Sequence, residues 1–495
     1  MPGTQKNETG SGLLWLTAAK FYFMLTGMAL LIALPAFFKK FYPDQHLELY
    51  GDFRTVMGLI NWVNMVLIGG TIQAVSKFVS EVPGRTDAVK FTTLKLQAVL
   101  AGAILLVFVF GADFLATHFY RDPTLAFYLR LAAPIVPIYA FYAVLIGCLN
   151  GLGRFKHQAL MDMTFATLKV GLTVGLVALG FAISGAIGAF LLTAAILLVI
   201  SWLLLGREGQ GGSADWRAIL AFQGQTLLFA FILNGLMQVD LQVLKAFAPA
   251  ALGDSSAQAG IYAAALQIGQ LPYVATISVA FVIFPMVSKS TFNQDAALTR
   301  SYISTTLRYS LLLLAAMASV LASNAGGLLS LVYPSEYGTG ALILAVLAGA
   351  YAFFAGAVIL SSIFTASGRP LLSIAIFSLG LGAAILGCRL LVPLHGGLGA
   401  ALGSLGGMAL AFLVATAASL KLFGVFCPLR SLLRLLLGLA AVAAIHFVWP
   451  EGGRLLLVPR ALVQMLAFGA VLYVAGERVP ELAAILARRR AKRQG

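Results

Sequence analysis

Residues 260–289, GIYAAALQIGQLPYVATISVAFVIFPMVSK, form an apolar stretch whose only charged side chain is the final Lys289. A helix needs about 20 largely apolar residues to cross the hydrocarbon core of a bilayer. This stretch is long enough, and similar stretches recur along all 495 residues. Hydrophobic residues make up 60% of the chain and charged residues only 10%, too few to cover a water-exposed surface. The sequence therefore predicts a polytopic membrane protein.

The apolar windows predict an all-α fold with about 14 transmembrane helices. Their expected positions are 13–38, 55–76, 93–112, 125–149, 158–180, 184–206, 218–246, 259–287, 303–323, 340–366, 371–392, 396–422, 429–449 and 455–476. The connecting segments are short, so no separate soluble domain is expected.

The distribution of Lys and Arg predicts the orientation of the chain. With the N-terminus inside, roughly two thirds of the 33 basic residues lie in cytoplasmic segments, as the positive-inside rule requires. Both termini are therefore expected in the cytoplasm. The net charge of +15 follows from this topology and does not indicate nucleic-acid binding.

Three pairs of short motifs indicate an internal repeat. Gly153-Arg154 matches Gly368-Arg369, Tyr120 matches Tyr333, and Ser76-Lys77 matches Ser288-Lys289, all at an offset of roughly 212 to 215 residues. The repeat unit holds six spans, an even number, so the second copy keeps the orientation of the first. This arrangement predicts two six-helix lobes in parallel repeat around a central cleft.

The predicted domain organisation follows from the repeat. Residues 1–206 form the first lobe, 207–217 a cytoplasmic linker and 218–422 the second lobe. Residues 423–476 supply two additional transmembrane helices, and 477–495 form a basic cytoplasmic tail.

Motifs for soluble-type catalysis are absent from the sequence. GREGQGGS, at residues 206–213, lacks the Lys-Ser/Thr end of a Walker A loop, and neither HExxH nor GxSxG occurs. The five histidines are scattered, and the three cysteines form neither a metal site nor a disulfide framework. The glycines of NGLGR, at residues 150–154, are better explained by a helix-ending turn. We expect no enzymatic activity, no metal and no cofactor.

Polar side chains inside the spans are the candidate functional residues, because such groups are costly in hydrocarbon. Arg54 and Asn61 are two helical turns apart and Asn64 is three residues further, so they share one helix face. Asn234, Gln238 and Gln242 follow one another at steps of four. The candidate substrate-binding residues are Lys20, Arg54, Asn61, Asn64, Asn234, Gln238, Gln242, Gln267 and Gln270.

Three further ionisable residues lie in the predicted spans. Asp240 points away from the Gln238 face, and two roles stay open for it: ligating a coupling cation or pairing with a basic neighbour. Asp162 and Lys169, two turns apart, are expected to form a structural pair.

The motifs resemble those of a known group. Residues 70–81, GTIQAVSKFVSE, look like the end of the second span in polysaccharide-transporter flippases. Residues 260–289 look like the eighth span of the same proteins, and the Gly-Arg turns also fit. This group belongs to the multidrug/oligosaccharidyl-lipid/polysaccharide exporter superfamily. Lys20 is the only basic residue in the first span before Lys39, unlike the arginine-rich first span of the lipid II flippase branch.

The resemblance implies export of a polyprenyl-diphosphate-linked oligosaccharide or related envelope precursor across a bacterial-type inner membrane by alternating access. It implies that spans one, two, seven and eight line the cleft and that cations such as Lys20 and Arg54 hold the diphosphate. The partners are then the lipid-linked sugar, membrane lipids and glycan-assembly enzymes, and coupling is open between Na⁺, H⁺ and the membrane potential. The alternatives are a cation-coupled multidrug exporter, a lipid II flippase and a membrane glycan polymerase or ligase.

Overall fold

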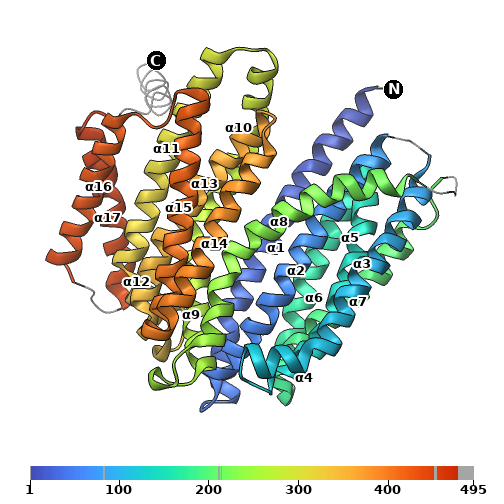
Figure 1. Ribbon diagram of the computed structural model, residues 1–495, viewed down its shortest axis with the longest axis horizontal. Helices are drawn as coiled ribbons and strands as arrows, with labels where there is room; N and C mark the ends of the chain where they lie inside the picture. Colours follow the sequence, from blue (N-terminus) through green and yellow to red (C-terminus); the bar gives the residue numbers. More distant parts are fainter. Residues whose placement is uncertain (1, 82–83, 210–211, 213, 451–453, 478–495) are drawn as a thin grey trace, which may run out of the picture. The chain divides into compact units, whose positions relative to one another are not determined.

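The protein is helical almost throughout. The computed structural model describes residues 2–81, 84–209, 212, 214–450 and 454–477, and these contain no strand. The α-helices (Figure 1) are α1 (Pro2–Phe41), α2 (His46–Glu81), α3 (Thr86–Phe114), α4 (Leu125–Ala132), α5 (Ile135–Gly151), α6 (Phe155–Leu176), α7 (Ala182–Leu205), α8 (Trp216–Phe247), α9 (Ser255–Gly269), α10 (Leu271–Phe292), α11 (Ala296–Ser323), α12 (Ala325–Val332), α13 (Ala341–Ala366), α14 (Pro370–His395), α15 (Gly397–Phe423), α16 (Leu429–Val448) and α17 (Arg454–Val474). The all-α prediction is confirmed.

Most of these helices are long and apolar enough to cross a membrane. Within the described residues, 12 helical stretches meet this condition. One of them, Phe155–Leu205, contains the predicted span 158–180 and all but the last residue of the predicted span 184–206, and Gly180 interrupts it with a φ of +96°. The predicted span 259–287 is divided between α9 and α10, and Pro272 occupies the first turn of α10. The chain is thus a multi-pass membrane protein.

The chain divides into two compact units. Met1–Gln267 and Phe377–Gly407 form the first unit, and Ile268–Ile376 and Met408–Gly495 form the second, so the boundaries run through α9, α14 and α15. In the first unit α8 packs along α2, while α1, α3, α5, α6 and α7 surround them (Figure 1). The second unit contains α10, α11, α12, α13, α16 and α17, together with parts of α14 and α15. The boundaries of these two units differ from those of the lobes expected at 1–206 and 218–422, and the two lobes stay a prediction.

The two Gly-Arg turns of the sequence repeat have the same local structure. Gly153 ends α5 with a φ of +70°, and Gly368 ends α13 with a φ of +79°. The following amide closes the turn in the same way, because Arg154 N donates to Leu149 O at 2.8 Å and Arg369 N donates to Phe364 O at 2.9 Å. Only glycine adopts this left-handed conformation without strain. The expectation of helix-ending turns is confirmed.

Glu477 joins three helices of the second unit. Arg308 of α11 and Arg434 of α16 donate to its two carboxylate oxygens, and Ser431 donates to both at 3.0 and 3.2 Å. Burial opposes ionisation, but the hydrogen bonds from Arg308 and Arg434 outweigh it and hold the pKa of Glu477 below its ordinary value. Glu477, three residues after the end of α17, therefore fixes that helix to α11 and α16. The basic tail predicted at 477–495 lies, apart from Glu477, outside the described residues.

Small residues allow α2 and α9 to cross at very short range. A Cβ atom on Gly51 of α2 would lie 1.8 Å from the carbonyl oxygen of Ser256, and one on Gly260 of α9 would lie 2.3 Å from Leu47 O. In membranes, such contacts supply packing energy that lipid displacement alone does not provide. This crossing places the start of α9 beside the part of α2 that carries Arg54.

We expect Gly51→Ala to lower the stability of the protein by about 2 kcal/mol or more, because the methyl group would displace backbone. Gly69→Ala on the same helix is the matched control, since a Cβ there would meet nothing within 4 Å. Thermal unfolding of the detergent-solubilised variants measures the difference. Equal midpoints for the two variants would contradict the close crossing.

Candidate functional site

Arg54 occupies the centre of the candidate site in the first unit. It is half-buried on α2, and its Nη1 donates to Oε1 of Gln267, at the end of α9, over 3.1 Å. Its guanidinium carbon lies 6.0 Å from the ring centroid of Tyr50. Among the residues that the structure describes, Arg54 has an amide and a ring as partners and no carboxylate. Among these residues no carboxylate compensates its positive charge, and an unpaired charge is costly inside a membrane.

The two asparagines of α2 differ in environment. Asn61 is half-buried, whereas Asn64 is only 3% exposed. Neither the Nδ2 nor the Oδ1 of Asn64 has a hydrogen-bond partner within the described part of the chain. Buried amides are normally hydrogen-bonded, so an unpaired one marks a position where a water or ligand group fits.

The amide face of α8 lies against α2. A Cβ on Gly58 would lie 3.0 Å from Nε2 of Gln242 and 3.2 Å from Oε1 of Gln238, so this glycine admits both side chains. Gln242 donates to the carbonyl of Thr55 at 3.2 Å and accepts from the hydroxyl of Tyr120 at 2.5 Å. Gln242 is therefore committed to holding α8 on α2, and half-buried Gln238 is the more available amide.

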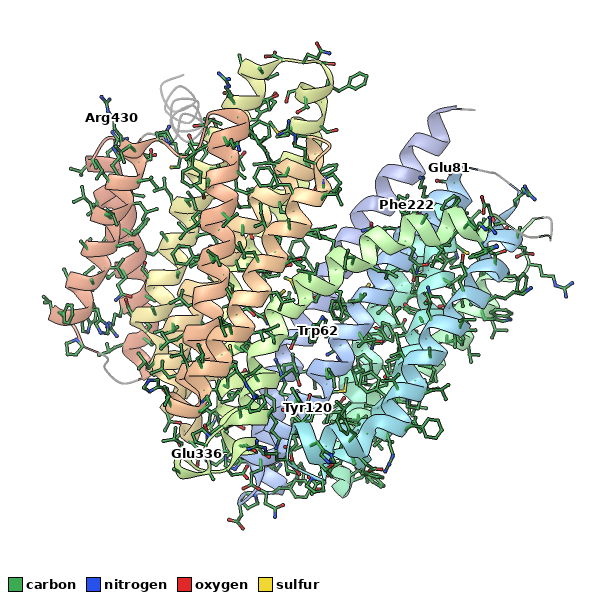
Figure 2. The ribbon with its side chains drawn as sticks, viewed as in Figure 1. Trp62, Glu81, Tyr120, Phe222, Glu336 and Arg430 are labelled. Carbon is green, nitrogen blue, oxygen red and sulfur yellow. The ribbon has the colours of Figure 1, made fainter. Side chains whose placement is uncertain are left out.

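Two aromatic residues, Trp62 and Tyr120, contact α8 at two different positions along its length (Figure 2). Trp62 donates its indole N–H to Phe231 O over 2.9 Å and stacks on the Phe231 ring at 5.0 Å between centroids. Tyr120 contacts α8 nearer its C-terminal end, where its hydroxyl donates a hydrogen bond to Gln242. The remaining α8 amide, Asn234, donates to Ala230 O of its own helix at 2.8 Å.

The structure therefore brings together part of the predicted set. Arg54, Gln242 and Gln267 converge on one segment of α2, because Gln242 bonds the residue next to Arg54 and Gln267 bonds Arg54 itself. Gln270 lies at the break between α9 and α10, in the second unit. The backbone of Lys20 belongs to α1, but its side chain lies outside the described residues.

Asp240 is bonded by neutral groups. It is fully buried, and its Oδ2 accepts from the hydroxyls of Tyr262 at 2.7 Å and Ser404 at 2.8 Å. Its Oδ1 accepts from the backbone N–H of Leu241 at 2.7 Å. Of the two roles that stayed open for Asp240, pairing with a basic neighbour is not found among the described residues, where Tyr262 of α9 and Ser404 of α15 supply hydroxyl donors to the carboxylate. No group of three or more His, Cys, Asp and Glu that could hold a metal occurs among them either.

Lys169 is a second cation that the sequence did not assign to the site. Its ammonium lies 4.5 Å from the ring centroid of Phe190 and 5.9 Å from that of Phe165, and the charge of Arg54 acts on it. The expected pair with Asp162 does not form, because seven residues separate them by about 10.5 Å along the helix. The sequence feature that could have assigned Lys169 to the site is its position midway along the predicted span 158–180. Aromatic faces stabilise such a cation without neutralising it.

Lys245 has a structural role at the end of α8. Its fully buried ammonium donates to Oδ1 of Asp52 and to Oδ2 of Asp122, both at 2.8 Å, and to Oγ of Ser256. Burial alone would raise the pKa of Asp122, but the hydrogen bond from Lys245 outweighs it and lowers that pKa. This network ties α8 to α2, to the segment before α4 and to α9. Lys245 is therefore not available to a substrate.

The hydroxyl of Thr71 on α2 joins α8 to α2 and α3, and we call these contacts the Thr71 node. The side-chain amides of Gln97 and Gln223 donate to Oγ1 of Thr71 at 2.9 and 2.7 Å, and all three side chains are fully buried. The sequence analysis did not single out these residues. They show that α2, α3 and α8 are fixed to one another by polar contacts as well as by packing.

The fold and these intramembrane polar groups define a multi-pass helical membrane protein. Residues 50–342, more than half of the chain, match the family described as "Polysaccharide biosynthesis protein". The chain therefore belongs to this family. No curated protein matches the sequence.

Solved structures show the same fold. The lipid II flippase MurJ, in an inward closed conformation, is similar with a TM-score of 0.76 at 15% identity, over 94% of this chain and 100% of that chain. An inward-facing multidrug resistance MATE family transporter of the MOP superfamily has a TM-score of 0.66 at 18% identity, over 81% of this chain and 94% of that one. A MOP superfamily transporter from Pyrococcus furiosus has a TM-score of 0.62 at 17% identity, over 84% and 96%. At these identities the likeness shows the fold alone.

We expect Lys245→Met to destabilise the protein by about 3–5 kcal/mol, because it leaves two largely buried carboxylates without their cation. Arg130→Met is the matched control, since Arg130 pairs with Asp113 at an exposed position, where ion pairs contribute about 1 kcal/mol or less. Thermal unfolding in detergent compares them. A loss for Lys245→Met no larger than for Arg130→Met would show that the network does not hold α8.

Proposed function

We propose that the protein is a flippase that exports a polyprenyl-diphosphate-linked oligosaccharide, or a related cell-envelope lipid precursor, across the inner membrane by alternating access. The observation that carries this proposal is Arg54, a cation within a membrane-spanning helix whose described partners are an amide and a ring. Membership of the polysaccharide biosynthesis family and the transporter fold support it.

The residues of the first unit divide into two groups under this proposal. Arg54 binds the diphosphate, Gln267 orients its guanidinium, and Lys169 adds positive potential nearby. Asn64, whose polar atoms have no partner among the described residues, and the half-buried amides of Asn61 and Gln238 bond the sugar hydroxyls. Asn234 and Gln242 are already bonded within the protein and contribute to the shape of the site.

Electrostatics explains why such a site catalyses transfer. A diphosphate anion leaves water for the membrane interior only at a large cost, and fixed cations replace part of its lost hydration. Lys20, on α1, is proposed to meet the diphosphate first from the cytoplasm, before Arg54. The polyprenyl tail remains in lipid throughout, so only the head group needs a polar path. Alternating access then exposes the bound head group to the outer side.

The driving force lies outside the chain in this proposal. The sequence has no Walker A motif for direct ATP use. Removal of product by glycan-assembly enzymes, an ion gradient of Na⁺ or H⁺, or the membrane potential would give net export. Both termini are proposed to lie in the cytoplasm, as the distribution of basic residues predicts.

We expect Arg54→Ala and Lys20→Ala to slow export of a lipid-linked oligosaccharide by ten- to hundredfold, on the order of one lost charge-assisted hydrogen bond each. Arg54→Lys should retain part of the activity. Lys77→Ala is the matched control, because Lys77 is exposed on the same helix and pairs with Glu81 at 3.8 Å. Flipping is measured in proteoliposomes by the access of an added lectin or glycosidase to the sugar. Full activity of both Ala variants would remove the assigned roles.

A cation-coupled drug exporter is the second candidate, and the buried carboxylate of Asp240 is the observation that favours it. A coupling cation would need this carboxylate to exchange its hydroxyl donors for the ion. The flippase proposal predicts that Asp240→Asn still exports the lipid-linked sugar and that gene deletion leaves drug tolerance unchanged. Drug tolerance that falls on deletion, and is not restored by Asp240→Asn, would favour the exporter instead.

A further inference from the structure

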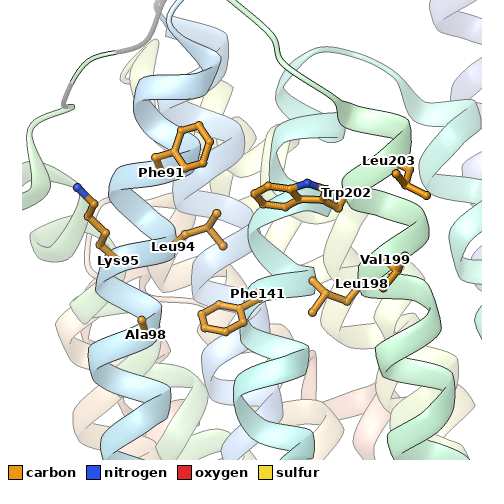
Figure 3. Close-up of a pocket in the computed structure, with 9 residues that line it drawn as sticks. All are labelled: Phe91, Leu94, Lys95, Ala98, Phe141, Leu198, Val199, Trp202 and Leu203. Carbon is orange, nitrogen blue, oxygen red and sulfur yellow. The ribbon is translucent and has the colours of Figure 1, made fainter.

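A groove with a volume of about 520 Å³ opens between α3, α5 and α7 of the first unit, and we call it the α3–α7 groove. Its volume lies within the roughly 300–1,000 Å³ typical of small-molecule sites. Figure 3 shows the rings of Phe91, Phe141 and Trp202 and the side chains of Leu94 and Leu198 turned toward this space. Trp202 is 47% exposed, so the groove is open to the surroundings of the protein. Lys95 is the single charged residue in its lining.

The groove runs inward from one membrane surface. The start of α3 and the end of α7 lie on the same side, because Lys90 Nζ donates to Gly206 O at 2.9 Å and Asp87 N donates to Glu208 O at 3.0 Å. Trp202 lies three residues before the end of α7, where tryptophan prefers the interface between headgroups and acyl chains. On α3 the groove lining runs from Phe91 to Ala98, about 10.5 Å along the helix. The groove can therefore hold the part of an acyl chain that lies nearest the headgroup.

Two lysines of α3 near the groove have different environments. Lys90 is 1% exposed and pairs with Asp87 at 2.6 Å. Lys95 is exposed, and no carboxylate within the described residues pairs with it. Figure 3 shows its side chain at the outer edge of α3, on the side away from Trp202, with the ammonium directed toward the end at which Phe91 lies. A lysine in this position extends its charge to the lipid headgroups.

We propose that the α3–α7 groove binds one anionic phospholipid, with an acyl chain against its rings and leucines and the phosphate at Lys95. The apolar lining matches the chain, and the uncompensated ammonium matches a negatively charged headgroup. Arg85 and Arg207, both exposed at the same membrane surface, add positive potential there. On the predicted topology this surface is cytoplasmic, where anionic lipids attract basic residues and basic pockets between helices bind their headgroups. This lipid site is distinct from the helix face that carries Arg54.

Brominated lipids test the proposal, because bromine quenches tryptophan fluorescence on contact. The full-length protein is placed in phosphatidylcholine vesicles that contain a small, fixed fraction of either dibrominated phosphatidylglycerol or dibrominated phosphatidylcholine. The difference between the native protein and Trp202→Phe isolates the signal of the groove. We expect the anionic lipid to occupy the groove about fivefold more strongly than the zwitterionic one, the effect of one lysine near the headgroups. Lys95→Gln should abolish that preference.

Two further variants separate the groove from the general charge of the surface. Ala98→Phe fills the groove and should remove the Trp202 quenching by both lipids. Lys156→Gln removes an exposed charge near the start of α6, outside the groove lining, and should leave the preference for phosphatidylglycerol unchanged. Equal quenching by both lipids in the native protein would overturn the proposal, as would an equal effect of Lys156→Gln and Lys95→Gln. Displacement of brominated phosphatidylglycerol by a polyprenyl phosphate, at equal fraction, would instead assign the groove to the tail of the transported lipid.

Discussion

The cost of leaving a charge unpaired in a membrane governs the polar groups of the first unit. Lys245 and Arg54 are both cations on membrane-spanning helices, but they meet this cost differently. Lys245 is fully buried between two carboxylates and a hydroxyl, so its charge is neutralised and its role is structural. Arg54 has an amide and a ring as its described partners, and its charge stays available for an anion. Whether a cation is paired with carboxylates, more than where it lies in the sequence, therefore distinguishes a structural residue from a candidate binding residue.

Close helix packing determines which amides stay available. Gly58 lets Gln238 and Gln242 approach α2, and Gly51 lets α9 approach the same helix. Gln242 and Gln267 are used to hold and orient their neighbours, whereas the polar atoms of Asn64 have no partner among the described residues. The Thr71 node and the Lys245 network fix α8 to α2 at two separate levels. A rigid scaffold of this kind allows the few remaining polar groups to be positioned for a ligand.

The sequence predicted the helices well because hydropathy and helix-breaking residues act locally. The turns at Gly153 and Gly368 lie where the sequence placed them, whereas the predicted span 259–287 is divided before Pro272. Periodicity also placed Arg54 on a polar face. It could not reveal the partners of Lys245, which lie 193 and 123 residues away along the chain, because such contacts depend on which helices pack together. For the same reason it paired Lys169 with Asp162 on one helix and missed Phe190 on the next.

Water accessibility at position 61 tests the central claim most directly. Asn61→Cys is made in a protein whose Cys148, Cys388 and Cys427 are replaced, with Phe110→Cys, at an exposed position of α3 (78%), as the lipid-facing control. We predict that a charged, membrane-impermeant thiol reagent modifies position 61 but not position 110, and that a lipid-linked oligosaccharide protects position 61. An Asn61→Cys thiol that resists the charged reagent from both sides of the membrane, in a folded protein, would contradict a polar, substrate-accessible face on α2.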